Sequence, residues 1–472
     1  MNDTPAGQVV LADQTSVAQL FYDVIQHTVR NYPSDFSALN IPASADEFRK
    51  SYPQWLPHFE SLRLASSARL SIARDMLNQF KGYIHWQDGK CERPLAAQMA
   101  GEGVPLSLMQ HQFPGSDVWQ PTMTYLGQRW DGTSMASLAE RLGRRNVISG
   151  KASEQLIWLA QNELASGLDL RGRKIVMLGA NAEMAPTRHW LAAGADVLWL
   201  DTQPPPEDWL HSRDWSGSIS WPEQPVDLLR QPADILATIR QFAGQAPVDL
   251  GLYAYAPGQA REVKLTEVMN ALVDALPGEL LRSVTLLVSP TTPTALEPDD
   301  VIALEQRLAQ RPAWEAVLGG MGLLGRRPEP VAATAAPVTH TVVGIQGASY
   351  QAAQYFGKVL AAELWRATGS HVVSANTAAI TKTRSLDHPV FAAAFGGAAA
   401  FGVETMTPRQ SRCLNGLLAA ADWLRPEAAA AGAVRVHGGL HTLPYPLEAA
   451  LQIAAGFGFV RSPRLVKGLF KR

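Results

Sequence analysis

The sequence predicts an α/β protein in which helices cover both faces of a parallel sheet, preceded by a mainly helical N-terminal domain. From about residue 172 onward, short apolar segments alternate with helical periodicity, as is typical of parallel strands joined by crossover helices. Residues 14–85 carry apolar side chains at helical spacing. A chain of 472 residues is too long for one ordinary core, so we expect more than one domain.

We place the domain boundary near residue 150. Residues 1–150 are predicted to form the N-terminal domain, whose role the sequence does not disclose, and residues 151–472 to form the sheet domain. Residues 296–340 interrupt the alternation of strands and helices, and we expect this insertion to lie over the substrate side as a lid or arm. The candidate strands are Lys174–Gly179, Asp196–Asp201, Ser216–Trp221, Asp249–Ala256, Ser283–Ser289 and His371–Asn376.

Composition and charge exclude several classes of protein. A formal net charge of −2 gives no basic surface for nucleic acid. The two cysteines, Cys91 and Cys413, lie far apart, which argues against a disulfide scaffold and suits a reducing compartment. The N-terminus does not show a basic region followed by an apolar run, and the sequence contains no run of 18 apolar residues. We therefore expect a cytoplasmic protein without a membrane-spanning helix. The pair His437 and His441 flanks two glycines and has no third ligand, so we expect no metal site.

The first candidate site is the turn after the strand that ends at Gly179. Phosphate binding requires backbone N–H groups aimed at an anion and small side chains where the ligand comes closest. Gly179, Ala182 and Ala185 follow a GxxGxxG spacing with alanine at the second and third positions. With Asn181 inside the same turn, these residues are the candidates for pyrophosphate binding in a Rossmann-type, doubly wound sheet.

Asp201 ends the next predicted strand, 22 residues after Gly179. In a βαβ unit this position faces the adenosine ribose, where a carboxylate accepts hydrogen bonds from the hydroxyls. The same carboxylate repels a 2′-phosphate. We therefore expect NAD rather than NADP as the cofactor.

Three later segments carry a family resemblance. The segment Pro225–Phe242 holds Asp227, a Pro-Ala pair and an apolar-periodic helix. Ser289 follows an apolar strand, and Tyr350 lies at the start of an apolar helix. In the order and spacing of these features, residues 172–425 resemble the short-chain dehydrogenase/reductase family. The resemblance implies that Asp227 lies beside the adenine ring, that Ser289 orients the substrate carbonyl, and that Tyr350 exchanges a proton with it.

The helix that carries Tyr350 departs from the family pattern. The family has a lysine four residues after the tyrosine, which lowers the pKa of the phenol and binds the ribose. Here that position is Gln354, and the next lysine, Lys358, lies eight residues from Tyr350. We therefore predict a remodelled site in which Gln354 replaces the lysine and Lys358 lies two helical turns along the same face.

The C-terminal part supplies two further expectations. The resemblance places Thr381, after the last predicted strand, against the nicotinamide amide or the pyrophosphate, and it implies a homo-oligomer. The stretch from Glu448 to Arg472 joins an apolar segment to a basic end. We expect a helix packed on the domain, with peripheral contact to anionic lipid as the alternative.

The sequence thus predicts an NAD-dependent oxidoreductase that acts on a hydroxyl or carbonyl group of an apolar or acyl-type small molecule. One alternative is a non-catalytic dinucleotide-binding sensor or partner protein, motivated by the missing lysine. A second alternative is an S-adenosylmethionine-dependent methyltransferase, because a glycine turn and an acid after the second strand also suit that cofactor.

Overall fold

The computed structural model describes most of the chain. It covers residues 7–116, 118–256, 258, 260–325, 332, 334–383, 389–430, 434–462 and 464–465. The basic end beyond residue 465 and much of the segment between residues 326 and 333 lie outside these ranges.

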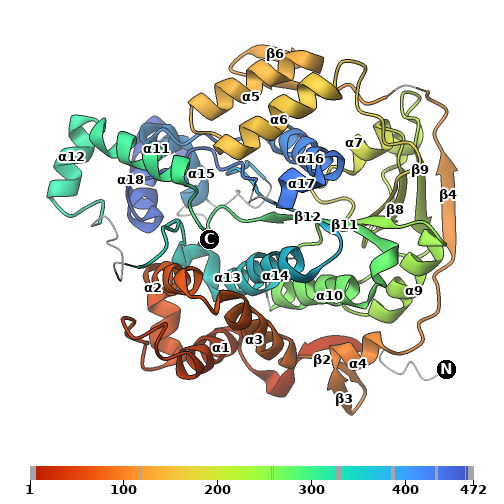
Figure 1. The fold of residues 1–472 in the computed structure, drawn as a ribbon, viewed down its shortest axis with the longest axis horizontal. Helices are drawn as coiled ribbons and strands as arrows, with labels where there is room; N and C mark the ends of the chain where they lie inside the picture. Colours follow the sequence, from red (N-terminus) through yellow and green to blue (C-terminus); the bar gives the residue numbers. More distant parts are fainter. Residues whose placement is uncertain are drawn as a thin grey trace.

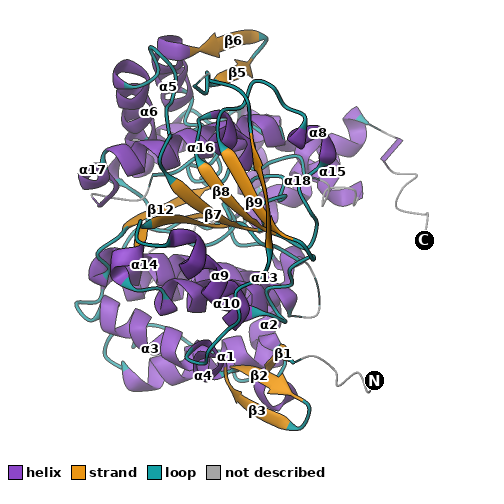
Figure 2. Ribbon diagram, turned by 90° about the vertical axis from the view of Figure 1, so that its right-hand side faces the viewer, coloured by secondary structure: helices purple, strands orange, loops and turns teal. Residues whose placement is uncertain are grey.

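A seven-stranded sheet runs through the middle of the molecule (Figure 2). Its order is β12-β11-β10-β7-β8-β9-β4, and all neighbours pair in parallel except β4 and β9. All six predicted strands are confirmed. Strands β9 and β10 are buried along their whole length, as expected for strands covered on both faces. The strands are β4 (Leu108–Gln112), β7 (Lys174–Leu178), β8 (Asp196–Leu200), β9 (Ser218–Pro222), β10 (Val248–Leu252), β11 (Leu281–Val288) and β12 (Val372–Thr377).

Helices cover both faces of this sheet, in agreement with the predicted α/β class (Figures 1 and 2). On one face lie α9 (Pro232–Ala243), α10 (Arg261–Ala275), α13 (Gly347–Gln354), the π-helical turn η5 (Tyr355–Leu360) and α14 (Ala361–Thr368). On the other lie α5 (Met135–Arg144), α6 (Gly150–Asn162), α7 (Thr187–Ala192), α16 (Pro408–Leu424) and α17 (Pro426–Ala430). The arrangement is compatible with a Rossmann-like fold.

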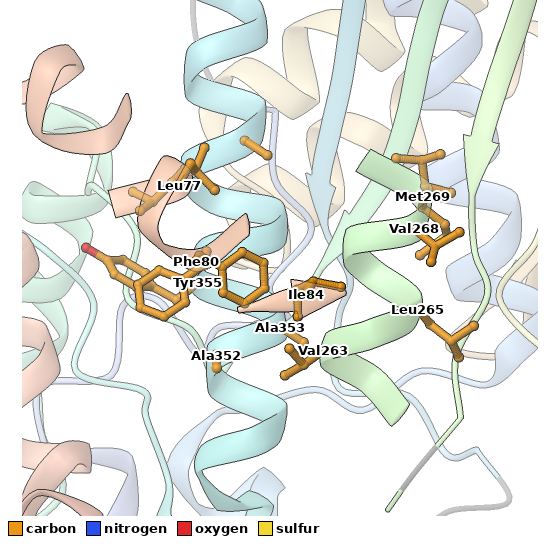
Figure 3. Packing of buried hydrophobic residues seen from close by; sticks show 14 of the residues in the cluster. Leu77, Phe80, Ile84, Val263, Leu265, Val268, Met269, Ala352, Ala353 and Tyr355 are labelled. Carbon is orange, nitrogen blue, oxygen red and sulfur yellow. The ribbon is translucent and has the colours of Figure 1, made fainter. Parts of the chain in front are cut away.

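The N-terminal helices form a further layer outside α10, α13 and α14 (Figure 1). Figure 3 shows side chains of α3 and β2 meeting those of α10, α13 and Tyr355 in one apolar cluster. The elements of this layer are α1 (Val17–Asn31), α2 (Ala45–Ala65), α3 (Arg69–Gly82) and α4 (Leu95–Met99), with a small sheet of β1 (Gln8–Leu11), β2 (Ile84–Asp88) and β3 (Cys91–Pro94).

The boundary predicted at residue 150 does not coincide with a division of the sheet. Strand β4 comes before it and pairs with β9 on the far side. The hairpin of β5 (Thr122–Tyr125) and β6 (Gln128–Asp131) and helix α5 also precede it, and α5 packs on α6. Residues on both sides of position 150 therefore belong to the same apolar clusters.

The described part of the insertion at 296–340 contains two helices. Helix α11 (Pro298–Ala309) and helix α12 (Ala313–Gly320) are separated at Pro312, which cannot donate a backbone hydrogen bond inside a helix. Together with α15 (Pro389–Gly397) and α18 (Leu447–Arg461) they form the group of helices on the left of Figure 1. A short helix, α8 (Glu207–Leu210), follows β8.

Candidate functional site

The strand order reverses between β7 and β10, which are neighbours in the middle of the sheet. From β7 the chain proceeds outward through β8 to β9, and it then returns to β10 on the other side and proceeds through β11 to β12. In open α/β sheets, ligands bind in the crevice at such a reversal, outside the carboxyl ends of the strands. The residues at this edge are therefore the candidate site.

Gly179 closes the first turn at this edge. Its φ of +79° lies in the region that favours glycine. A Cβ at this position would lie 2.4 Å from the backbone N and Cα of Ala254, which follows β10. The Gly179 N–H also donates to the carbonyl of Leu200 at 2.9 Å. Only glycine fits here, because three strand ends meet at one point.

The predicted residues Asn181 and Asp201 lie together. The backbone N–H of Asn181 donates to Asp201 Oδ2 at 2.9 Å, and the N–H of Gln203 donates to Asp201 Oδ1 at 3.2 Å. Within the turn, the Ala182 N–H donates to Gly179 O and the Ala185 N–H to Ala182 O, at 3.1 and 2.9 Å. The N–H groups of Ala182 and Ala185 are therefore used inside the turn, and that of Asn181 helps to fix the Asp201 carboxylate.

Asp227 lies near this end of the sheet. The N–H of Val226 donates to the carbonyl of Asp201 at 3.1 Å, and Asp227 Oδ1 accepts the N–H of Leu229 at 2.9 Å. Asp227 lines a cavity of about 170 Å³ together with Gln8, Val9, Leu229, Arg230, Arg261 and Lys264. The N-terminal strand β1 thus forms part of its surroundings.

At the carboxyl end of β11 the structure brings Ser289 and Tyr350 together. Burial is the largest influence on the pKa of Tyr350 and raises it, and the nearby Tyr255 and Glu262 raise it further. A hydrogen bond with Ser289 lowers it in part, and the resulting pKa is about 12. Ser289 Oγ lies 2.7 Å from Thr291 Oγ1, and Thr291 donates to Gln346 Oε1 at 2.5 Å. Tyr350 is therefore a neutral phenol in a fixed hydroxyl network at neutral pH.

Gln354 and Lys358 both bind the end of β11 instead of facing Tyr350. Gln354 Oε1 accepts the backbone N–H of Ser289 at 2.9 Å, and Lys358 Nζ donates to the carbonyl of Leu287 at 2.8 Å. Lys358 is not among the groups that shift the pKa of Tyr350. The π-helical turn η5 begins at Tyr355 and contains Lys358, so the regular helical spacing assumed from the sequence does not apply between Tyr350 and Lys358.

Burial lowers the pKa of Lys358 from 10.5 to about 8, which predicts a pH-dependent stability. Below pH 8 the folded protein holds a buried ammonium at a cost. Between pH 8 and 10.5 the folded state loses this proton more readily than the unfolded chain, so this contribution to stability rises with pH. We expect the stability advantage of Lys358→Met over the natural protein to be greatest below pH 8 and to shrink by roughly 1–3 kcal/mol across this window.

Urea unfolding at pH 7, 8, 9 and 10 measures this difference. Lys90→Met, on the exposed turn between β2 and β3, is the control. If Lys358→Met and the natural protein show parallel pH profiles, the ammonium does not carry the expected burial cost.

Thr381 lies on the loop after β12. Its hydroxyl donates to the carbonyl of Ala379 at 2.8 Å, and its backbone pairs with Met406. The neighbouring Lys382 N–H donates to the Met406 carbonyl. The structure thus holds Thr381 in a backbone network at the β12 end of the same edge.

Sequence reasoning missed several residues around Tyr350. The Tyr255 ring, 54% exposed, packs edge-on against the Tyr350 ring at 6.3 Å. Glu262, in the first turn of α10, accepts from the Gly258 N–H at 3.0 Å and from Ser349 Oγ at 3.3 Å. Tyr255 follows β10 within the Tyr-Ala-Tyr sequence. This second aromatic residue at a strand end was the sequence signal that could have indicated a site residue.

A larger cavity of about 430 Å³ lies beyond the carboxyl end of β12. Val436 N–H donates to the Thr377 carbonyl there, and the buried His437 lines the cavity. Helix α11 contributes to the wall through Asp299, Asp300 and Ala303. The other lining residues are Glu140, Gly143, Arg144, Asn146, Ile148, Ser149, Gly150, Ser153 and Glu154.

The two histidines noted in the sequence stack face to face. The rings of His437 and His441 lie 4.8 Å apart at 5°, and burial lowers the pKa of His437 to about 3. In the described part of the chain, no group of three or more His, Cys, Asp or Glu side chains is placed to hold a metal ion.

Neither a protein-family model nor a curated protein matches the chain. The resemblance to short-chain dehydrogenases therefore rests on the residues described above. Across the described residues, no helix combines the length and apolar character needed to cross a membrane.

Proposed function

We propose that the chain is an NAD-dependent oxidoreductase that acts on a carbonyl or hydroxyl group of a small molecule. The observation that carries the proposal is the pairing of Ser289 with Tyr350 on the sheet edge that also holds Gly179 and Asp201. The strand order, read outward in both directions from β7 and β10, supports a doubly wound Rossmann-type topology.

The residues at this edge fit the adenosine half of such a cofactor. The turn carries only small side chains at Gly179, Ala182 and Ala185, as a close approach of the cofactor requires. Asp201 is held by two backbone N–H groups, and the remaining lone pairs of its carboxylate suit the ribose hydroxyls. The nicotinamide, when bound, supplies or takes a hydride.

The state of Tyr350 favours reduction over oxidation. With a pKa of about 12, its phenol is protonated at neutral pH and donates a proton to the oxygen of a carbonyl whose carbon receives the hydride. Ser289 orients that oxygen, and Gln354 fixes Ser289 through its backbone N–H. The reverse reaction needs a phenolate, and among the described residues no cation beside Tyr350 stabilises one.

Tyr350→Phe tests this role. We expect the variant to bind NADH as the natural protein does but to reduce carbonyl substrates about 100-fold more slowly, because the proton donor is absent. NADH fluorescence measures binding, and NADH oxidation with a panel of apolar aldehydes and ketones measures turnover. Tyr255→Phe is the matched control, since its ring lies beside Tyr350. Equal turnover by Tyr350→Phe and the natural protein would remove Tyr350 from the mechanism.

A second candidate is a dinucleotide-binding protein without catalysis. It is favoured by the engagement of both Gln354 and Lys358 with β11, so that neither is the partner of Tyr350. This candidate predicts NADH binding with no turnover on any carbonyl. Gln354→Lys distinguishes the two, because a remodelled enzyme should change strongly in rate and a sensor should not.

A further inference from the structure

Three arginines gather beside the turn that follows β7. Arg412 of α16 donates through Nη1 to the carbonyl of Glu183, inside the turn, at 2.9 Å. One helical turn earlier lies Arg409, and Arg188 lies in α7, which the turn leads into. Helix α16 packs directly on this segment, since a Cβ at Gly416 would lie 3.3 Å from Pro186 Cβ. The arginine cluster is defined here as Arg188, Arg409 and Arg412.

This arginine cluster carries more positive charge than its surroundings neutralise. None of its three guanidinium groups forms a salt bridge with a carboxylate of the described residues, although Asp208 and Glu183 attract Arg188 and Arg412 from nearby. The Nε atoms of Arg188 and Arg412 are buried without a hydrogen-bond partner in the described structure. The pKa of Arg412 is lowered to about 10, mainly by burial and secondly by repulsion from Arg188.

Local structure holds the cluster in place without an anion. Thr407 and Gln410 cap the first turn of α16 reciprocally, which fixes the backbone on both sides of Arg409. The Arg188 guanidinium lies over the Trp209 ring, 4.9 Å from its centroid. A cation such as Arg409 in the first turn of a helix is unfavourable, because the helix dipole there favours negative charge. A bound anion would offset both the positive charge of the cluster and the unfavourable position of Arg409.

We propose that the arginine cluster binds the diphosphate bridge of the dinucleotide. The proposal rests on the proposed function and deepens it. The Asn181 N–H donates to the Asp201 carboxylate, and the N–H groups of Ala182 and Ala185 donate to carbonyls of the turn, so these three groups are not the donors for a phosphate. Arginine side chains provide donors in a geometry that matches phosphate oxygens, and these lie beside the same turn.

The test uses the full chain with the variants Arg188→Gln and Arg409→Gln. Arg425→Gln is the matched control, because Arg425 follows the same helix and pairs with Glu427. We expect each cluster variant to bind NADH and NADPH about tenfold or more weakly, with equal losses for the two, while the control binds normally. Inorganic pyrophosphate should displace NADH from the natural protein. Calorimetry measures the affinities, and thermal unfolding verifies that each variant is folded.

The outcomes separate this proposal from the proposed function. Unchanged NADH binding in folded Arg188→Gln and Arg409→Gln overturns the cluster assignment and leaves the oxidoreductase standing. A loss confined to NADPH overturns the diphosphate assignment, because it points to a 2′-phosphate instead. Arginine-dependent pyrophosphate binding without any dinucleotide binding keeps the anion site and overturns the oxidoreductase. If neither pyrophosphate nor dinucleotide binds, both proposals fail.

Discussion

Gly179→Ala is expected to lower the free energy of unfolding by about 3 kcal/mol or more. A non-glycine residue at a φ of +79° costs roughly 1–2 kcal/mol by itself. The added Cβ would also meet the backbone of Ala254 at 2.4 Å, where no flexible side chain can move aside. The ends of β7 and β10 must therefore separate. Urea unfolding followed by tryptophan fluorescence measures the change.

Gly172→Ala separates the two contributions. Gly172 has nearly the same φ, +80°, but a Cβ there would meet nothing within 4 Å. We expect this control to lose only the conformational part, about 1–2 kcal/mol. Equal losses for the two variants would mean that the contact between the strand ends is not tight. The same Gly179→Ala protein should also lose NADH affinity, since the displaced turn carries Asn181 and Asp201 with it.

Arg63→Met is expected to destabilise the protein by about 3–5 kcal/mol. The Arg63 side chain is 0% exposed and bridges Glu60 and Glu363, both at 2.7 Å. Tyr355 donates to the same Glu60 carboxylate. Removing the guanidinium leaves Glu60, which is 1% exposed, as a buried charge without its cation. The variant therefore weakens the contact between the N-terminal helices and the helix layer on the sheet.

Two further variants identify the cause of this loss. Arg69→Met removes an exposed partner of Glu363 at 3.6 Å, and we expect less than about 1 kcal/mol. Arg63→Met combined with Glu60→Gln should recover part of the loss, because the uncompensated charge is gone. If the double variant is no more stable than Arg63→Met, lost packing and not buried charge explains the effect. Urea unfolding applies to the whole series.

Part of the candidate site could be predicted from the sequence and part could not. Gly179 and Asp201 were identifiable because each follows directly from the strand before it, and the two strands are neighbours in the sheet. Ser289 and Tyr350 were proposed from the resemblance to the short-chain dehydrogenase/reductase family. The partners of Gln354 and Lys358 were not foreseen, because both bind backbone groups at the end of β11, and Lys358 also lies in the π-helical turn η5.

By itself, the sequence determined the sheet and its crossover helices, because buried parallel strands are short, continuous apolar runs that do not depend on distant partners to be recognised. The tertiary structure alone decided that β4, from before residue 150, joins that sheet. It also decided that the Asn181 N–H bonds to Asp201, and that Arg412 reaches Glu183 across 229 positions of sequence. Hydrogen bonds and charge clusters of this kind depend on which surfaces pack together, and the local periodicity of the sequence does not encode that packing.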